Sequence, residues 1–320
     1  MHDLLAIDNL RTYFHTSQGV VKAVDGVSIK ICEQEIVGLV GESGCGKSTM
    51  ALSIMRLVSS PGRIDGSICF KGKNLLSLTE EEMRKIRGRQ ISIVFQDPFT
   101  FLNPVMKIGD QLSEAVSLHR EVDKASLREE IIELLKTVRL PSPANTTDSY
   151  SFQLSGGMCQ RTVIAIALSG HPSLLIADEP TTALDVTVQL QILNLLRQLK
   201  NELKMSILLI THDLGIVAEL CDRVYVMYAG KIVEHANVFS LFEKPLHPYT
   251  AGLLGSVLSI DEFMDNLTSI RGDVPDLIKP PSGCRFHPRC QHCKAVCSMK
   301  EPPMIEIERG HFVSCWLLAK

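Results

Sequence analysis

A glycine-rich stretch, Gly41-Glu42-Ser43-Gly44-Cys45-Gly46-Lys47-Ser48, constrains the fold of this chain more than any other feature of its sequence. It follows an apolar run, Ile36–Val40, and precedes a helical pattern that begins at Thr49. Glycines let successive backbone N–H groups turn inward onto an anion, and the N-terminus of the following helix adds its dipole. The Lys47 ammonium would reach the β- and γ-phosphates of a nucleotide, and the Ser48 hydroxyl would ligate Mg²⁺. The stretch therefore predicts a nucleotide-phosphate site at a strand-to-helix turn.

The pattern of apolar runs predicts an α/β fold with a mainly parallel sheet. Helical patterns separate the runs, most clearly from Val186 to Leu203, where the apolar residues form one stripe. The stretch from about Lys107 to Thr137 reads as helical only, which predicts a helical insertion between two strands. The expected buried strands are Ile36–Val40, Ile91-Ser92-Ile93-Val94-Phe95, Leu174-Leu175-Ile176-Ala177 and Ile207-Leu208-Leu209-Ile210.

Two carboxylates complement the phosphate loop. Asp178 and Glu179 directly follow the apolar run that begins at Leu174, and ligands of α/β proteins gather at the carboxyl ends of strands. One carboxylate can hold the Mg²⁺ shell, while the next can orient and polarise an attacking water. An acid at a strand end is more often only solvated, so the interpretation depends on the phosphate loop.

Composition and charge exclude several classes of protein. With 33 basic and 36 acidic residues the net charge is −3, which does not favour nucleic acid as a partner. The N-terminal Met1-His2-Asp3-Leu4 lacks the pattern of a signal peptide, and no apolar run approaches the roughly 18 residues of a membrane span. We therefore expect a soluble, cytoplasmic chain.

A further motif resembles one that is typical of a known protein family. Leu154-Ser155-Gly156-Gly157-Met158-Cys159-Gln160-Arg161 resembles the signature sequence of ATP-binding-cassette (ABC) ATPases, the motor subunits of ABC transporters. Gln96 stands where that family has its Q-loop, Ala183-Leu184-Asp185 matches its D-loop, and His212 matches its switch histidine. The resemblance covers roughly residues 4–255. It implies a P-loop NTPase core in residues 1–255, with a helical signature subdomain at about 97–168 and an extension at 256–320.

The resemblance also implies roles for individual residues. Ser155, Gly156 and Gly157 would close on ATP held by the opposite subunit, so each site needs two subunits. Gln96 would contact Mg²⁺ and the water, His212 the γ-phosphate, and Phe14 the adenine, with Tyr13 as the alternative. The expected catalytic residues are Glu179, His212 and Gln96; the Mg²⁺ ligands are Ser48, Gln96 and Asp178; and the ATP contacts are Phe14, Gly41, Ser43, Gly44, Cys45, Gly46, Lys47, Ser48, Thr49, Gln96, Asp178, Ser155, Gly156, Gly157 and Asp185.

Two cysteines lie inside these motifs. Cys159 departs from the family pattern, which usually has a larger polar or basic residue there, but the Ser-Gly-Gly cap is intact and ATP engagement should survive. Cys45 in the phosphate loop is either a redox liability or, more simply, a packing residue.

Three shorter motifs indicate which branch of the ABC transporter family the chain resembles. Phe95-Gln96-Asp97-Pro98, Leu102-Asn103-Pro104 and Lys244-Pro245-Leu246-His247-Pro248-Tyr249-Thr250 resemble the dipeptide, oligopeptide and nickel uptake systems. The resemblance implies a second, different ATPase subunit, two transmembrane permeases, an extracytoplasmic solute-binding protein, and a peripheral position on the cytoplasmic face of the inner membrane. Apolar residues that could receive a coupling helix of a permease are Phe99, Phe101, Leu102 and Pro104.

The alternative is a soluble ABC ATPase that acts in DNA repair or translation. Such proteins commonly carry two cassettes or a long coiled coil, whereas this chain has one cassette and no heptad array. A nucleotide switch without turnover is disfavoured because Glu179 and His212 are both present. We therefore expect a transporter ATPase.

The cysteines suggest a metal site in the extension. Of ten cysteines, five are scattered (Cys32, Cys45, Cys69, Cys159 and Cys221) and read as small buried residues. The other five form Cys284-x5-Cys290-x2-Cys293-x3-Cys297 with Cys315 downstream. A short loop-rich segment with little core needs a staple, and cysteine-only ligation leaves structural Zn²⁺ or an iron–sulfur cluster.

The cysteine spacing and the family resemblance predict different sets of metal ligands. Spacing alone would select Cys284, Cys290, Cys293 and Cys297. ATPases of the peptide-importer branch carry a C-x5-C-x6-C pattern with a fourth cysteine downstream, and some hold a [4Fe–4S] cluster there. By this resemblance the ligands are Cys284, Cys290, Cys297 and Cys315, with Cys293 left over and Zn²⁺ as the alternative metal. The implied role is structural, in a Cys-rich, metal-binding C-terminal extension.

Overall fold

The computed structural model describes residues 3–119, 123–182, 184–255 and 270–319. These residues form two compact units. Unit 1 consists of residues 32–35 and 77–209, and unit 2 of residues 3–31, 36–76 and 210–319. The boundary differs from the expected division at residues 255 and 256, which stays a prediction. Residues 256–269, where the sequence pattern loosens, lie outside the described part of the chain.

Unit 2 begins with an antiparallel sheet in the order β2-β1-β4-β5. Strand β1 pairs with β4 from Leu5 opposite Phe70 to Phe14 opposite Gly62, with an irregularity between Asp8 and Arg11. Helix α1, which follows the phosphate loop, packs on β1, where the buried hydroxyls of Thr12 and Ser53 lie 2.7 Å apart. The elements are β1 (Asp3–Thr16), β2 (Gly19–Cys32), α1 (Lys47–Ile54), β4 (Gly62–Phe70) and β5 (Lys73–Asn74).

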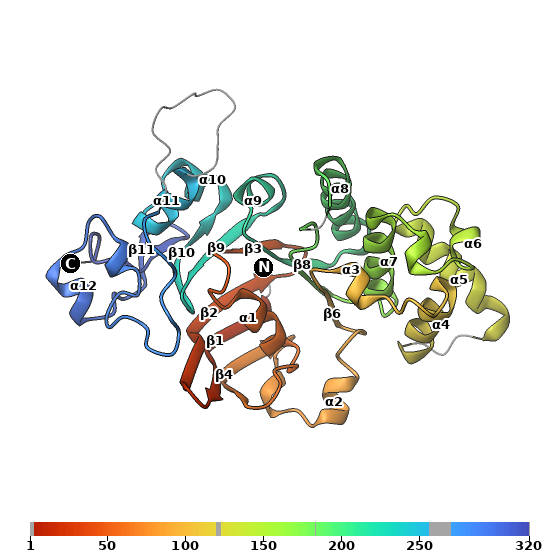
Figure 1. Cartoon of the computed structure of the whole chain (residues 1–320), viewed down its shortest axis with the longest axis horizontal. Coiled ribbons are helices and arrows are strands. Elements are labelled where there is room, and N and C mark those ends of the chain that lie inside the picture. Colours follow the sequence, from red (N-terminus) through yellow and green to blue (C-terminus); the bar gives the residue numbers. More distant parts are fainter. Residues whose placement is uncertain (1–2, 120–122, 183, 256–269, 320) are drawn as a thin grey trace. The chain divides into compact units, whose positions relative to one another are not determined.

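A second group of strands in unit 2 lies in the order β11-β12-β10-β9-β3 (Figure 1). Only β3 and β9 are parallel; the others run antiparallel to their neighbours. The elements are β3 (Ile36–Val40), α9 (Leu214–Leu220), β9 (Arg223–Tyr228), β10 (Lys231–Asn237), α10 (Val238–Glu243), α11 (Pro248–Gly255), α12 (Ala295–Met299), β11 (Ile305–Glu308) and β12 (His311–Val313).

The expectation of a mainly parallel sheet is therefore wrong for this unit, where the sheet is mixed. The reason is a tight turn. Ala229 and Gly230 join β9 to β10, and both have positive φ (46° and 81°), as a two-residue hairpin turn of the primed type requires. A connection of this length can join only antiparallel strands.

Unit 1 contains the predicted helical insertion. Strand β6 pairs in parallel with β7, and the strand order is β8-β7-β6. Helices α3 to α7 gather beyond β6 and pack on one another (Figure 1). The elements are α2 (Glu80–Arg84), β6 (Ile91–Val94), α3 (Pro98–Phe101), α4 (Ile108–His119), α5 (Lys124–Thr137), α6 (Pro143–Thr146), α7 (Gly156–Leu168), β7 (Leu174–Asp178), α8 (Val186–Leu203) and β8 (Ser206–Thr211).

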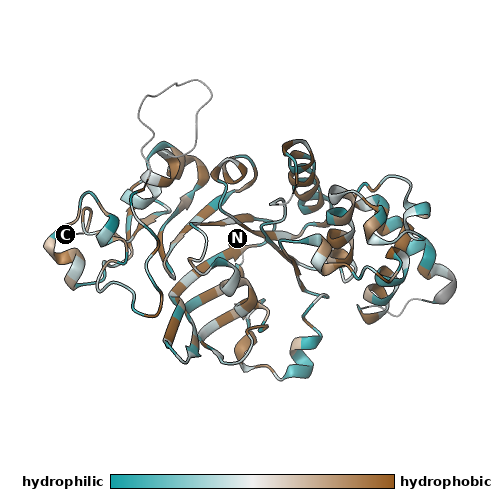
Figure 2. Ribbon diagram, in the orientation of Figure 1, coloured by the Kyte–Doolittle hydropathy of each residue, from teal (hydrophilic) through white to brown (hydrophobic). Residues whose placement is uncertain are grey.

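The local sequence explains the main elements. Every residue of β3, β7 and β8 is buried, which confirms three of the four apolar runs as buried strands. The fourth run forms β6, which ends at Val94 rather than Phe95 and is buried except for the half-buried Ile93. Helix α8 has the predicted bounds, with Asp185 as its N-cap. Helix α2 begins with a capping box in which Thr79 and Glu82 hold each other's backbone N–H groups. This short helix is largely hydrophilic (Figure 2). No helix in the described part of the chain is long and apolar enough to cross a membrane.

A buried carboxylate fastens the C-terminal strands to the fold. The side chain of Glu234, on β10, is fully buried. Its Oε1 accepts from the Leu246 N–H at 2.8 Å and lies 2.7 Å from Nε2 of His311 on β12, and its Oε2 accepts from the His247 N–H at 2.9 Å. Buried charges are stable only with such a full set of partners, so Glu234 makes β10, β12 and the start of α11 depend on one another.

We expect Glu234→Ala to lower the free energy of unfolding by about 3 kcal/mol, since it leaves buried donors without an acceptor. Urea denaturation followed by the fluorescence of Trp316, the single tryptophan, measures the change within unit 2. The control is Glu308→Ala, which removes an exposed carboxylate from the adjacent strand β11 and its ion pair with Lys244, and should shift the midpoint far less. Equal shifts for the two variants would contradict this role of Glu234.

Candidate functional site

The phosphate loop of unit 2 is built around glycines that approach other backbone closely. A Cβ at Gly41 would lie 2.1 Å from the carbonyl oxygen of Met227, and a Cβ at Gly46 would lie 2.1 Å from that of Ala23. Gly44 has open space around it but φ of +78°, which disfavours other residues. The loop can therefore run between β2 and β9 only with glycine at these positions.

Lys47 lies inside the loop. Its side chain is buried, and Nζ donates to the carbonyl oxygens of Gly41 at 2.8 Å and Glu42 at 3.0 Å. Ser48 is exposed and Thr49 half-buried in the first turn of α1. No side chain caps the N-terminus of this helix, so its first N–H groups face the loop. A buried cation and a helix N-terminus together form an anion site.

Cys45 reads as a packing residue in the structure. Its side chain is fully buried, its Sγ lies 3.8 Å from Lys47 Nζ, and burial raises the pKa of its thiol. Since the thiolate is the reactive form, we expect Cys45 to react slowly with alkylating agents and oxidants.

The two aromatic candidates for the adenine differ in their contacts. The hydroxyl of Tyr13 donates to Asp25 at 2.5 Å, and burial together with this bond raises the pKa of Tyr13 to about 12. Asp25 is also paired with Arg285. Phe14 is half-buried near Gly62, where a Cβ would lie 2.9 Å from Phe14 Cε1. Tyr13 is thus engaged in a polar network, whereas the Phe14 ring has no such partner to orient it.

Unit 1 brings together the predicted catalytic carboxylate and Gln96. Nε2 of Gln96 donates to Glu179 Oε2 at 3.0 Å, and the Thr182 hydroxyl donates to the same oxygen at 2.9 Å. Glu179 follows the buried Asp178 at the end of β7 and has φ of +48°, a conformation that is uncommon for residues with a side chain. Such strain persists where the surrounding structure enforces it, often at functional sites.

Thr182 is not among the site residues that were predicted from the sequence. The sequence does carry a weak signal, a hydroxyl three residues after the acid, and a turn in which the Thr182 N–H donates to the Glu179 carbonyl at 3.3 Å brings the two side chains together.

The signature motif forms the start of α7. Ser155 is its N-cap, and Oγ accepts from the Met158 N–H at 3.3 Å. A Cβ at Gly157 would lie 2.6 Å from Cγ1 of Val188 on α8, so only glycine allows the two helices to approach this closely. Asp185 is exposed and accepts from the Val188 N–H at 3.0 Å. Ala183 lies outside the described residues.

The remaining predicted residues have mixed outcomes. His212, in unit 2, is exposed directly after β8. Phe99 and Phe101 are 51% and 42% exposed, and Pro104 is exposed as well. Leu102 is only 1% exposed, so the expectation that it offers surface is wrong: its side chain belongs to the core of unit 1. Val105, which the sequence reading did not select, is 81% exposed.

Four cysteines of the C-terminal extension share one neighbourhood. Burial, together with the nearby thiols of Cys315, Cys297 and Cys290, raises the pKa of Cys284 to about 11. The Cys284 N–H donates to the Cys297 carbonyl at 2.8 Å. Cys297 and Cys315 are buried, whereas Cys293 is exposed.

This neighbourhood is not arranged as a single-ion site. In the residues that the structure covers, no group of three or more His, Cys, Asp or Glu side chains is placed to hold one metal ion. A tetrahedral Zn²⁺ with bonds of about 2.3 Å needs sulfur atoms about 3.8 Å apart. The donor chemistry of four thiols fits a metal group, although the described side chains are not arranged around one.

Comparison with known proteins identifies the family. The family model of the ABC transporter matches residues 24–182, and that of the oligopeptide/dipeptide transporter C-terminal region matches residues 233–297. The oligopeptide transport ATP-binding protein AppD of Bacillus subtilis is 49% identical over 99% of this chain and 97% of its own. The oligopeptide transport ATP-binding protein OppD of Escherichia coli is 46% identical over 98% of this chain and 93% of its own.

The chain belongs to the ATP-binding subunits of the oligopeptide/dipeptide ABC transporters. Its resemblance to the ABC ATPases is confirmed, and it is an ATP-hydrolysing transporter subunit. The alternative of a soluble ABC ATPase outside transport has no support.

Solved structures agree on the fold. The dimeric, post-hydrolysis structure of the ATP-binding cassette MJ0796 bound to ADP and phosphate is 27% identical, with a TM-score of 0.65, and the match covers 73% of this chain and 98% of that one. The cbiO1 protein of Clostridium perfringens, part of the ABC transporter complex cbiONQ, is 27% identical with a TM-score of 0.66 over 76% of this chain and 92% of its own. The cassette portion therefore has the ABC ATPase fold.

The burial of the motif cysteines predicts their reactivity. Burial raises the pKa of Cys159 to about 11, so at pH 8 its thiolate fraction is far below that of an ordinary thiol, and the same direction holds for Cys45. With iodoacetamide at pH 8 we expect Cys293 to be carbamidomethylated while Cys45 and Cys159 stay unmodified, as peptide mass spectrometry can show. Labelling in urea is the control and should modify all ten cysteines. Modification of Cys159 as fast as that of Cys293 would refute the prediction.

Proposed function

We propose that this chain powers the import of dipeptides or oligopeptides through partner permeases, with nickel complexes and related solutes as the other cargo class. The observation that carries the proposal is the match of residues 233–297 to the oligopeptide/dipeptide C-terminal region, joined to a complete cassette. The similar proteins AppD, DppD and OppD are named for oligopeptide or dipeptide transport. We place the chain as a peripheral subunit on the cytoplasmic face of the inner membrane.

The partners in this proposal are a second, different ATPase subunit, two transmembrane permeases and an extracytoplasmic solute-binding protein. A patch of exposed apolar side chains on and after α3 supports a permease contact: Phe99, Phe101 and Val105 are 51%, 42% and 81% exposed. Exposed apolar residues gathered in one short segment mark interaction sites. The patch directly follows Gln96, so a permease helix seated on it would act on the residue that holds Glu179.

ATP binding uses the phosphate loop. We expect Lys47 Nζ to exchange its bonds with the Gly41 and Glu42 carbonyls for bonds with β- and γ-phosphate oxygens. The loop residues Gly41, Ser43, Gly44, Cys45, Gly46 and Thr49 contribute backbone groups, and Phe14 contacts the adenine. Ser155, Gly156 and Gly157 of α7, together with Asp185, meet the nucleotide of the opposite subunit.

Hydrolysis depends on Glu179. Its carboxylate, oriented by Gln96 and Thr182, accepts a proton from the attacking water. His212 donates a hydrogen bond to the γ-phosphate. Ser48, Gln96 and Asp178 would hold Mg²⁺, which neutralises phosphate charge when bound. The positive φ of Glu179 aims its side chain differently from that of a regular strand residue.

For the extension we propose that Cys284, Cys290, Cys297 and Cys315 hold a [4Fe–4S] cluster, with Zn²⁺ as the alternative. Two observations support the set: the thiols of the other three cysteines lie near enough to Cys284 to raise its pKa, and Cys293 is exposed. In a cluster each thiolate would bind a different iron, and cysteine-only ligation suits such a group. The group would supply a covalent staple.

The test of function uses the complete transporter, reconstituted in proteoliposomes with its permeases and binding protein. We expect ATP-dependent uptake of labelled peptide, and Glu179→Gln should lower ATP hydrolysis by about 10²–10⁴-fold while ATP still binds, because only the proton acceptor is lost. The matched control is Thr182→Val, which keeps the carboxylate and removes one of its donors; its loss should be less than about tenfold.

Two outcomes would contradict the proposal. Uptake of nickel complexes without uptake of any peptide would assign the other cargo class. Wild-type hydrolysis by Glu179→Gln would remove the catalytic role of this residue.

The cluster has its own test. Protein purified without oxygen should be brown, with broad visible absorption and about four irons per chain. Cys315→Ser should lose most of this iron, whereas the control Cys293→Ser should keep it. A colourless protein with one zinc would refute the cluster, and full iron retention in Cys315→Ser would refute the ligand set.

A further inference from the structure

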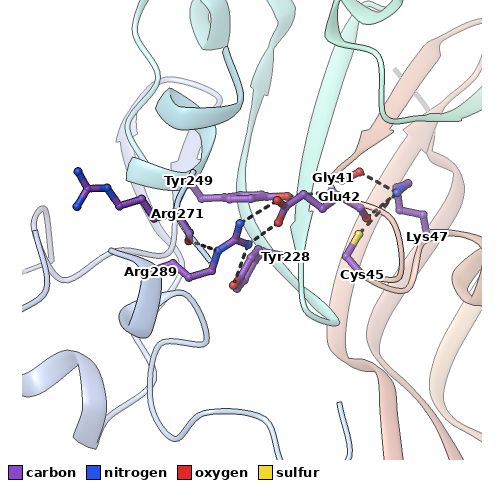
Figure 3. Close-up of polar contacts among 8 residues, drawn as sticks. All are labelled: Gly41, Glu42, Cys45, Lys47, Tyr228, Tyr249, Arg271 and Arg289. Atoms are coloured by element: carbon purple, nitrogen blue, oxygen red, sulfur yellow. Dashed lines mark hydrogen bonds and ion pairs between the residues drawn. The ribbon is translucent and has the colours of Figure 1, made fainter. Parts of the chain in front are cut away.

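An ion pair joins the cysteine-rich extension to the phosphate loop. NH1 and NH2 of Arg289 donate to Oε2 and Oε1 of Glu42 at 2.6 and 3.0 Å, which makes the contact bidentate (Figure 3). Glu42 is a member of the phosphate loop, and Arg289 immediately precedes Cys290. Two-point contacts of this kind fix direction as well as distance, so the extension holds one side chain of the loop in a set orientation.

Arg289 is itself fixed on three sides. Nε donates to the Arg271 carbonyl at 2.9 Å, NH1 lies 3.4 Å from the Tyr228 hydroxyl, and the guanidinium carbon lies 5.8 Å from the Tyr228 ring centre. Its side chain is only 7% exposed, and that of Glu42 26%. The bonds to Glu42 are the largest of the contributions that raise the pKa of Arg289. A pair so shielded and so well held is worth more than an exposed salt bridge.

A second contact holds the backbone at the same residue. The Glu42 N–H donates to the Tyr249 hydroxyl at 2.9 Å. The ring of Tyr249 is fully buried and packs on Tyr228 and on Phe286, with ring centres 4.6 and 5.4 Å away. Phe286 belongs to the extension, between Cys284 and Cys290. Both the side chain and the backbone of Glu42 therefore depend on the extension.

We propose that Arg289 is a positioning residue for ATP binding, which neutralises Glu42 and holds the phosphate loop in its binding conformation. The proposal rests on the phosphate site described above. Glu42 places a carboxylate in a loop that must receive a polyanion, and an unpaired charge there repels phosphate. Since Lys47 donates to the Glu42 carbonyl, a displaced Glu42 also misplaces the phosphate-binding ammonium.

Repulsion between an unpaired Glu42 carboxylate and the nucleotide should grow with the number of phosphates, so the proposal can be tested with ligands that carry three, two or no phosphates. In the full-length chain, Arg289→Gln should weaken binding of fluorescent methylanthraniloyl-ATP by about tenfold, that of the matching ADP by less, and that of the matching adenosine by no more than about twofold. The control is Arg271→Ala, because Arg271 contributes only its carbonyl and its side chain points away from Glu42 (Figure 3); it should bind all three probes like the wild type.

A second substitution separates charge from folding. Adding Glu42→Gln to Arg289→Gln removes the unpaired carboxylate and should restore ATP affinity to within about threefold of wild type, which would not occur if the extension had merely unfolded. If Arg289→Gln does not fold, Arg289→Lys keeps the charge without the bidentate geometry and should give an intermediate loss.

Unchanged ATP affinity in Arg289→Gln would overturn the proposal. So would an equal loss for adenosine and ATP, or no recovery in the double variant. Lys47→Ala, measured beside them, tests the phosphate site alone: if it still binds ATP like the wild type, the site assignment fails, whatever Arg289 does.

Discussion

The backbone of the phosphate loop lies so close to the neighbouring strands that no side chain fits at Gly41 or Gly46. The positions of these strands depend on that close contact. Gly41 lies against the Met227 carbonyl and Gly46 against the Ala23 carbonyl, so β9 and β2 both line the loop. The Gly230 N–H, in the turn after β9, donates to the Cys45 carbonyl at 2.8 Å. Two segments far apart in sequence, β2 and the end of β9 with its turn, thus hold the loop in one conformation, and a preorganised loop binds an anion more tightly.

The proposed catalytic carboxylate, that of Glu179, is positioned by a strained backbone and by side-chain donors. Glu179 has an unfavourable backbone conformation at the end of a fully buried strand, and side-chain donors from Gln96 and Thr182 orient it. The buried strand can bear this local cost of about 1–3 kcal/mol. Gln96 lies between strand β6 and the exposed apolar patch on α3. A partner that binds the patch could therefore change the orientation of the Glu179 carboxylate through Gln96.

The sequence predicts the features that depend on neighbouring residues and misses those that depend on residues far apart in the chain. Buried strands such as β7, helix α8 and the turn that holds Lys47 follow from neighbouring residues, and all were predicted. The antiparallel strands β10 to β12 were not, since their apolar residues are interrupted by Glu234 and His311, which are buried as partners of each other. Leu102 could not be separated from Phe101 by type; only packing shows which is exposed. The pair of Glu42 and Arg289, 247 residues apart, leaves no local signal.

The order of the two units along the chain bears on how the protein is made. Unit 1 ends at Leu209, whereas in unit 2 the phosphate loop, which is translated early, contacts β9 and Arg289, which are translated much later. At roughly 5–20 residues per second on the ribosome, unit 1 is complete several seconds before unit 2 can close. The nascent phosphate loop therefore lacks its contacts with β9 and Arg289 until most of the chain has been translated.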